Sequence, residues 1–328
     1  MGVYAFIVVV DPFDSLPLAP SFERAPPSVD QRYSFPALAR KPHFDSAVIG
    51  TSTSRMLRPD CLDGAFGARF VNLAINGGTR WELAQLLEVF LRHHPRPRVV
   101  ILGLDDRWLG EDETRPGPSP DFAFPPWLYD EDRWNDLLHV FDRWTLDQAR
   151  RQFMQLLGWR RSGHDPDGYR GFERDFGAYD AARAAMRIYE ERPRSWQPVT
   201  PPLELTQAER AAIYFPAHVE LAALLGAIPA QTLKVGYFPP SHAAWLGPEG
   251  GRADAVRALA KARVAELFAQ TPNARLVDFM IRSDLTRGDH NFWDPYHIVD
   301  AAADRVCSAL SEAGQGEDAS EICVVLVR

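Results

Sequence analysis

A serine and an acid–histidine pair near opposite ends of the chain have the side chains needed for acyl transfer. The segment Ile-Gly-Thr-Ser places Ser52 where an apolar run meets a turn, and the segment Trp-Asp-Pro-Tyr-His places Asp294 three residues before His297. These three side chains are the types that serve as nucleophile, orienting carboxylate and base in covalent acyl transfer. Each also has a simpler interpretation, because a serine after a strand suits a helix N-cap and an Asp-Pro pair suits a turn.

Five short apolar runs, rich in β-branched residues, are expected to form the strands that position these side chains. They lie within 45–52, 70–76, 98–105, 232–238 and 275–280. Helical repeats separate them. One helix opens with Thr79 and Glu82 at capping-box spacing, and another is expected from Thr206 to about Leu225. This alternation predicts an α/β fold with three layers, α/β/α, and a mostly parallel five-stranded sheet. The tail 322–327 is a candidate for an additional edge strand.

Polar residues follow most of these strands at the point where each strand ends. Ser52 follows the first, Gly77 the second and Asp105 the third, while Asp294 and His297 come after the fifth. Because parallel strands end at the same edge of a sheet, these residues are expected to converge there, where open α/β sheets bind ligands. Gly77 could otherwise simply turn the chain, and Asp105 could lie in a solvated loop.

The pattern divides the chain into an α/β domain and two other parts. The domain covers 44–109 and 206–328, and it is interrupted by residues 110–205, which predict a mostly helical insertion and a cap over the sheet edge. Residues 1–43 are expected to be an apolar stub followed by an extended connector. The apolar stretch 2–10 is too short to span a bilayer. It is interpreted either as a buried first strand or as the end of a longer membrane helix that would anchor the protein.

Composition narrows the possible partners. The 328 residues carry a net charge of −8, which argues against nucleic acid, because phosphate binding requires clustered cations. Five arginines between 143 and 161 are interpreted as a solvated helical face. The three cysteines have no metal-binding spacing and can form at most one disulfide. Neither a metal nor a cofactor is predicted.

The order of these segments resembles the SGNH/GDSL hydrolase superfamily, in its divergent cell-envelope branch. Gly50-Thr51-Ser52 stands where the family has Gly-Asp-Ser, Asn72–Thr79 is similar to the second block, and Asp294-x-x-His297 matches the last. The resemblance covers most of the chain outside the insertion and implies a flavodoxin-like SGNH fold. It assigns Ser52 as nucleophile, His297 as base and Asp294 as the residue that fixes the tautomer of His297. It also implies oxyanion donors at the amides of Ser52 and Gly77.

One block departs from the family pattern. The third block of the family reads Gly-x-Asn-Asp, and its Asn side chain donates to the oxyanion, whereas this chain has Gly103-Leu104-Asp105-Asp106. An ionised carboxylate accepts hydrogen bonds and repels a developing oxyanion. Asp105 is therefore expected to decide whether the site is active.

The implied function is that of a serine esterase or O-acyltransferase that acts on acyl, above all acetyl, esters of an envelope polysaccharide. The alternative is a catalytically impaired glycan-binding or assembly protein. A cell-envelope or periplasmic location is favoured over a cytoplasmic one. Trp293 and His242 are accessory candidates for substrate binding, although packing of the tryptophan and a structural role for the histidine are the simpler interpretations.

Overall fold

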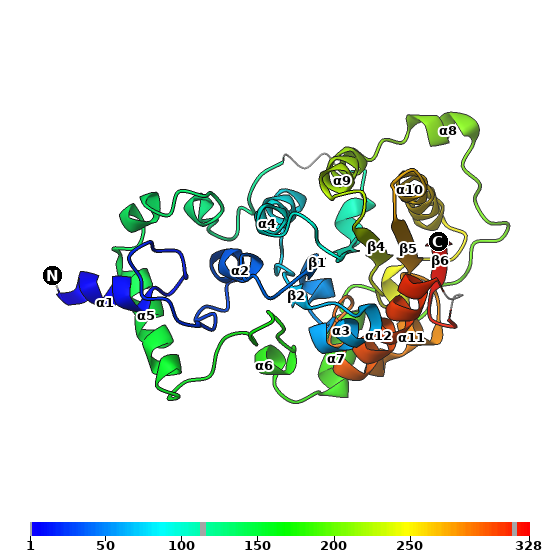
Figure 1. Ribbon diagram of the computed structural model, residues 1–328. Coiled ribbons are helices and arrows are strands. Elements are labelled where there is room, and N and C mark those ends of the chain that lie inside the picture. The colour runs from blue at the N-terminus through cyan, green and yellow to red at the C-terminus, as the bar shows by residue number, and fades with distance from the viewer. Residues whose placement is uncertain (1, 112–115, 317–319) are drawn as a thin grey trace.

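A computed structural model describes residues 2–111, 116–316 and 320–328 and contains a six-stranded mixed sheet with helices on both faces (Figure 1). The strands are β1 (Ser46–Ile49), β2 (Phe70–Asn72), β3 (Val99–Gly103), β4 (Leu233–Phe238), β5 (Ala274–Asp278) and β6 (Val324–Val327). Their order across the sheet is β2-β1-β3-β4-β5-β6. The first five strands are parallel, and β6 pairs antiparallel with β5 at the edge. The α/β class is thus confirmed, and the sheet has six strands rather than five because the C-terminal tail pairs with β5.

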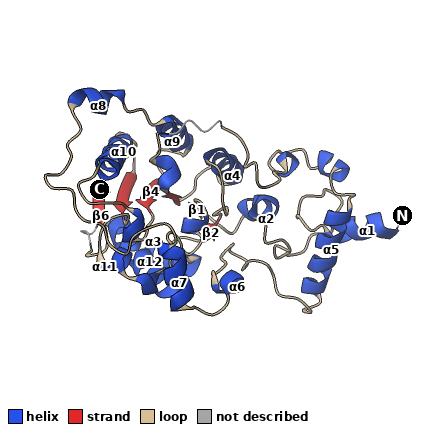
Figure 2. Ribbon diagram, turned by 180° about the vertical axis from the view of Figure 1, so that it is seen from behind, coloured by secondary structure: helices blue, strands red, loops and turns tan. Residues whose placement is uncertain are grey.

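Both faces of the sheet are buried, which explains the apolar runs in the sequence. On β3, Val100 and Leu102 belong to one hydrophobic core, and Val99 and Ile101 belong to the core on the opposite face. A central parallel strand is covered on both sides, so all its side chains are apolar. Figure 2 shows the strands between the two groups of helices.

The main helices that cover the sheet fall into two groups, one on each face. The first group is α2 (Gln31–Ala39), α4 (Arg80–His93), α9 (Pro216–Ala227) and α10 (Arg252–Ala269). The second group is α3 (Pro59–Phe66) and α12 (Asp300–Gln315), which a disulfide between Cys61 and Cys307 joins; Cys323 is a buried free thiol. Helix α4 begins with the expected capping box, since the side chains of Thr79 and Glu82 bond each other's backbone amides.

The helix expected from Thr206 is divided into two. Helix α8 (Gln207–Ala212) has the capping box of Thr206 and Glu209, but it ends before α9 begins at Pro216. A residue that precedes proline is disfavoured in the helical region, and Phe215 is extended there, with φ −117° and ψ 96°. One proline therefore divides the predicted helix.

The N-terminal region differs most from the sequence-based expectation. Residues Gly2–Val10 form a helix, α1, so the prediction of a buried strand is wrong. The supposed connector contains α2, which Asp30 caps and which includes Pro36. Proline cannot donate to the carbonyl of Arg32, and the hydroxyl of Tyr129 donates to that oxygen instead, at 3.1 Å. A tertiary hydrogen bond thus replaces the helical bond that Pro36 cannot make.

The segment 110–205 contains α5 (Arg143–Leu156), α6 (Glu173–Phe176) and α7 (Ala181–Tyr189), joined by long loops. Helix α5 lies against α1 at one end of the molecule, and the chain then returns beside α3 and α12 (Figure 1). The short α11 (Asp284–Arg287) precedes the loop of His297. Among the described residues, no helix is both long enough and apolar enough to cross a membrane.

Candidate active site

Ser52 begins a single 3-10 turn, Ser52–Ser54, just beyond the end of β1. The buried side chain of Ser54 fixes this turn, because its hydroxyl accepts a hydrogen bond of 2.9 Å from Tyr237 of β4. A Cβ atom at Gly50 would lie 2.2 Å from that hydroxyl, and one at Gly103 would lie 1.9 Å from it. The glycines at the ends of β1 and β3 therefore make room for the side chain that holds the turn of Ser52.

Asn72, the last residue of β2, supports the same turn from the other side. Its side-chain amide donates to the carbonyls of Ser54, Arg55 and Leu57, at 3.2, 3.3 and 2.8 Å. The sequence places Asn72 in a block that resembles the family, but its role as a clamp depends on this tertiary contact. It holds the segment that follows Ser52.

Ser52, His297 and Asp294 form one continuous hydrogen-bonded chain. The Ser52 Oγ lies 2.8 Å from His297 Nε2, and His297 Nδ1 lies 2.7 Å from Asp294 Oδ2. An acceptor beside Nδ1 selects the tautomer with a proton on that nitrogen, so Nε2 is free to accept the serine proton. The residues that the sequence separates by more than two hundred positions are thus in contact.

The carboxylate of Asp294 is held in its charged form. Burial on its own raises the pKa of this carboxyl, but the hydrogen bond and charge of His297, together with the amides of Tyr296 and His297, lower it below the usual value. Those amides donate to Asp294 Oδ1 at 3.0 Å each. The carboxylate can therefore both orient His297 and stabilise its protonated form.

The insertion contributes one wall beside the histidine. The ring of Phe172 lies 4.6 Å from that of His297, and the guanidinium of Arg55 lies 4.1 Å above the same phenyl ring. Arg55 is in turn paired with Asp175 of α6. Phe172 packs against the imidazole of His297 and limits the rotation of that ring. Sequence reasoning missed this residue because nothing local distinguishes it from other aromatics in the insertion.

Gly77 lines the same cleft as Ser52, and its backbone has the left-handed conformation that glycine adopts most easily. Its φ is +59°, and a Cβ there would lie 3.3 Å from the ring of Phe122. Its carbonyl accepts from Arg107 at 3.1 Å. Its amide has no hydrogen-bond acceptor within the described ranges, so that N–H is available to a ligand oxygen.

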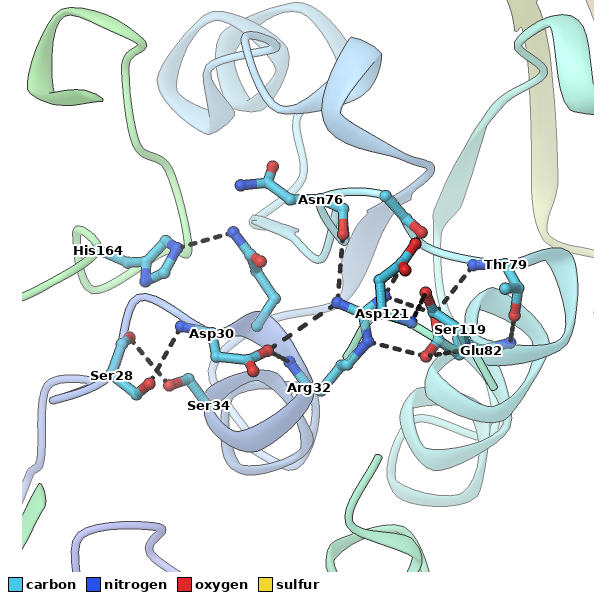
Figure 3. A network of polar contacts seen from close by, with 12 residues as sticks. Ser28, Asp30, Arg32, Ser34, Asn76, Thr79, Glu82, Ser119, Asp121 and His164 are labelled. Carbon is cyan, nitrogen blue, oxygen red and sulfur yellow. Dashed lines mark hydrogen bonds and ion pairs between the residues drawn. The ribbon is translucent and has the colours of Figure 1, made fainter. Parts of the chain in front are cut away.

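A buried ion pair holds the segment of Gly77 in place (Figure 3). The guanidinium of Arg32 bonds both carboxylate oxygens of Glu82 at 2.8 Å and also donates to the carbonyls of Asn76 and Gly77, at 3.2 and 3.5 Å. The amides of Thr79 and Ser119 complete the shell of Glu82. Arg32 and Glu82 are 1% and 0% exposed, so every polar atom here needs its partner. No sequence pattern indicates a role for Arg32, because it lies in the segment expected to be an extended connector.

Asp105 lines the same cleft as Ser52 and His297 and acts as an acceptor. Its Oδ2 accepts the hydroxyl of Thr51 at 2.6 Å, and its Oδ1 accepts the amide of Arg107 at 3.1 Å. Burial raises the pKa of Asp105, and the Thr51 bond and the charges of Arg107 and Arg80 offset this only in part. The carboxyl is therefore more easily protonated than an exposed one. Only the protonated form has a proton to donate.

These groups surround a cleft of about 330 Å³. Its lining includes Ser52, Gly77, Asp105 and His297, and Met280 and Tyr296 supply apolar surface. The volume is at the small end of the range for small-molecule sites. Ser52, His297 and Gly77 thus line the same space.

The two accessory candidates lie outside this cleft. His242 is buried and bonds Asp289 at 3.2 Å, while its amide donates to the carbonyl of Pro295. Trp293 packs against the rings of Phe176 and Tyr179, and its amide donates to the carbonyl of His297. Both support the loop that carries Asp294 and His297, and neither lines the space beside Ser52. Their assignment to substrate binding has no support in this cleft.

No group of three or more histidine, cysteine, aspartate or glutamate side chains is placed to hold a metal ion in the part of the chain that the structure describes. Comparisons with models of known protein families and with curated proteins gave no match to this chain.

Proposed function

We propose that the protein is a serine-dependent acyl-ester hydrolase or O-acyltransferase of the SGNH type. The observation that carries the proposal is the chain from Ser52 Oγ through His297 to Asp294, at 2.8 and 2.7 Å. A nucleophile within reach of a base, with that base oriented by a carboxylate, is the arrangement that activates serine for covalent catalysis.

The first half of the reaction forms an acyl-enzyme. Ser52 Oγ attacks the ester carbonyl while its proton moves to His297 Nε2, and the carbonyl π electrons move to the oxygen. The tetrahedral intermediate collapses when the C–O bond to the alcohol breaks, and His297 returns the proton to the departing oxygen. Asp294 stays ionised throughout and stabilises the imidazolium.

The second half transfers the acyl group to an acceptor. Water or a sugar hydroxyl attacks the acyl-enzyme carbonyl, His297 Nε2 takes the acceptor proton, and Ser52 Oγ leaves and regains a proton from His297. The amide N–H groups of Gly77 and Ser52 are the proposed oxyanion donors. The buried Arg32–Glu82 pair supports this role, because Arg32 binds the carbonyl of Asn76 in the peptide that carries the Gly77 amide.

The departures from the family pattern contact each other. Thr51 replaces the acid that the family has before its serine, Asp105 replaces the third-block asparagine, and the two side chains bond at 2.6 Å. Compared with the family, this chain therefore has its acid at position 105 and its neutral side chain at position 51, and these two positions are in contact. Both oxygens of Asp105 act as acceptors, from the hydroxyl of Thr51 and the amide of Arg107, so the ionised carboxylate supplies no donor at this position.

The proposed substrate is an acetylated polysaccharide of the cell envelope, by analogy with the family. A cleft of about 330 Å³ suits a short acyl group on one sugar unit better than a long acyl chain. The disulfide between Cys61 and Cys307 supports an oxidising compartment such as the periplasm.

Hydrolysis of p-nitrophenyl acetate by the full chain tests the proposal. The wild type is expected to release p-nitrophenol and to show an acetyl adduct in its intact mass, and Ser52→Ala is expected to show neither. Ser241→Ala removes another hydroxyl that lines the cleft but lies outside the triad, so it should retain the reaction. Equal rates from wild type and Ser52→Ala, or no reaction from either, would remove the esterase claim.

A second candidate is a non-catalytic glycan-binding or assembly protein. It is favoured by one observation, the acceptor role of Asp105 where the family has a donor. Binding of acetylated polysaccharide that is equal in wild type, Ser52→Ala and His297→Ala, with no acyl adduct in any of them, supports this function over catalysis.

A further inference from the structure

One end of the molecule has a surface that neither the sheet nor the cleft explains. It is formed by α1 and residues 141–161, which we call the tip surface, and it lies at the end away from β6 (Figures 1 and 2). The two parts pack through aromatic pairs: Tyr4 with Phe141 at 4.7 Å between ring centroids, and Phe6 with Phe153 at 5.6 Å. The contact fixes the apolar helix α1 beside α5.

The tip surface exposes an unusual amount of apolar area. Of the 23 large hydrophobic side chains that are exposed among the described residues, nine lie here. Trp159 is 73% exposed, Tyr4 is 53% exposed and Val9 is 52% exposed; the others are Val3, Phe141, Trp144, Phe153, Leu156 and Leu157. A concentration of exposed apolar side chains is typical of an interaction site.

Positive charge is concentrated on the same surface. Residues 141–161 contain five arginines and two acids, Asp142 and Asp147, in a chain whose net charge is −8. Arg150 and Arg151 pair with Asp147, and Arg143, Arg160 and Arg161 are exposed. The tip therefore has the opposite charge to the protein as a whole.

The helical geometry of α5 places the two kinds of side chain together. Thr145, Gln148, Ala149 and Gln152 are buried along one side of the helix. Arg143, Arg150, Phe153 and Leu157 follow at helical spacing on the opposite side and are exposed or partly exposed. Apolar groups and cations thus alternate on one outward surface.

We propose that the tip surface docks the protein onto an anionic lipid bilayer. Helix α1 has no charged side chain, so its outer residues suit the acyl boundary, while the flanking arginines suit lipid phosphates. Tryptophan, as at positions 144 and 159, is enriched at the level of the headgroups. The arginines that the sequence predicts to form a solvated helical face are thus assigned to a docking surface that is both basic and apolar. This inference does not depend on the chemistry of Ser52.

Co-sedimentation of the full chain with vesicles tests the docking. Vesicles of phosphatidylcholine alone are compared with vesicles of phosphatidylcholine and phosphatidylglycerol. The wild type is expected to bind the anionic vesicles and to release as salt is raised. Arg160→Gln with Arg161→Gln should weaken binding by about fivefold for each arginine removed. Trp159→Ser with Leu157→Ser should weaken it by about tenfold or more.

Matched control variants lie on α7. Arg183→Gln and Met186→Ser remove an exposed arginine and a side chain that is 65% exposed, far from the tip, and should leave binding unchanged. All these positions are exposed, and an unchanged circular dichroism spectrum and Tm confirm folding. The proposal is overturned if the wild type binds no vesicles, or if the tip and α7 variants bind equally. It is also overturned if the tip variants abolish self-association of the chain and leave lipid binding intact.

Discussion

The two sides of Ser52 are built on different principles. On one side, Asp294 and His297 come from a single loop, three residues apart, and their hydrogen bonds satisfy each other. On the other side, Gly77 and Asp105 come from separate strand ends and are held by residues elsewhere in the chain, Arg32 and Thr51. The base side is local and complete, whereas the oxyanion side depends on long-range contacts and contains an acceptor. With the base side complete, whether the intact site is active is expected to be decided on the proposed oxyanion side.

Breaking the base side should have the largest effect. Asp294→Asn cannot hold the same tautomer of His297 or balance its charge, so kcat for ester hydrolysis is expected to fall by about 10,000-fold. Asp289→Asn is the matched control, because Asp289 bonds the other histidine, His242, outside the cleft. Equal losses of kcat in the two variants would show that the catalytic chain through Asp294 is not used.

Changing the acceptor on the oxyanion side should have the next largest effect, in the opposite direction. Asp105→Asn supplies an N–H donor at the family position and removes a carboxylate, so kcat is expected to rise by about 100-fold. Asp106→Asn removes the neighbouring charge in the same cleft and should change kcat far less. Thr51→Asp with Asp105→Asn restores the family pattern at both positions, and it should keep the gain. A fall in kcat for Asp105→Asn would mean that the carboxyl itself is needed.

Loosening the support of Gly77 should have a smaller effect. Arg32→Lys keeps the charge opposite Glu82 but cannot reach both its oxygens and the two carbonyls, so kcat is expected to fall by about tenfold with little change in KM. Arg24→Lys is the control: Arg24 is also buried and bonds the carbonyls of Val10, Pro20 and Phe22 far from the cleft. If both variants lower Tm but only Arg32→Lys lowers kcat, Arg32 is a positioning residue. A parallel fall in kcat assigns it a structural role alone.

The smallest effect is on stability, and its sign differs between the two sides. The pKa of Asp294 is lowered, so its contribution to folding is present above the unfolded pKa near 3.8 and is lost as pH falls. The pKa of Asp105 is raised, so the folded state binds more protons and stability falls as pH rises above 3.8. In urea titrations, Asp294→Asn should lose on the order of 1 kcal/mol at neutral pH and converge with wild type in acid. Asp105→Asn should instead be more stable than the wild type, by an amount that grows as pH rises above 3.8. A stability change of the same sign in both variants at neutral pH would contradict this assignment.

The parts of this arrangement that could be predicted from sequence are those with a local signal. The apolar runs identified β1 to β5, because a strand covered on both faces has a continuous apolar pattern. The expected convergence of Ser52, Asp294 and His297 is confirmed by their contacts, since parallel strands place their carboxyl ends at one edge. The capping box at Thr79 also formed as its spacing indicates.

The parts that could not be predicted depend on contacts between distant segments. Helix α1 has no periodicity to separate it from a strand, since its nine residues are all apolar or glycine apart from one tyrosine. Helix α2 contains a proline that only Tyr129 compensates. His242 and Trp293 contact residues around the loop of His297 and do not line the cleft, because the direction of a side chain in an irregular loop has no sequence signal. Cys61 and Cys307 are separated by 246 positions, so their pairing was not evident.

That pairing has a consequence for how the chain tolerates cleavage. Cys61 lies on α3, the helix after Ser52, and Cys307 lies on α12, the helix after His297. The disulfide therefore links the segment that carries Ser52 to the segment that carries His297. A protease that nicks one of the long loops between residues 116 and 205 cuts the backbone between those segments but not their covalent link. The two fragments remain one molecule and keep Ser52 beside His297. Reduction after nicking would leave the two fragments held by non-covalent contacts alone, such as the pairing of β3 with β4.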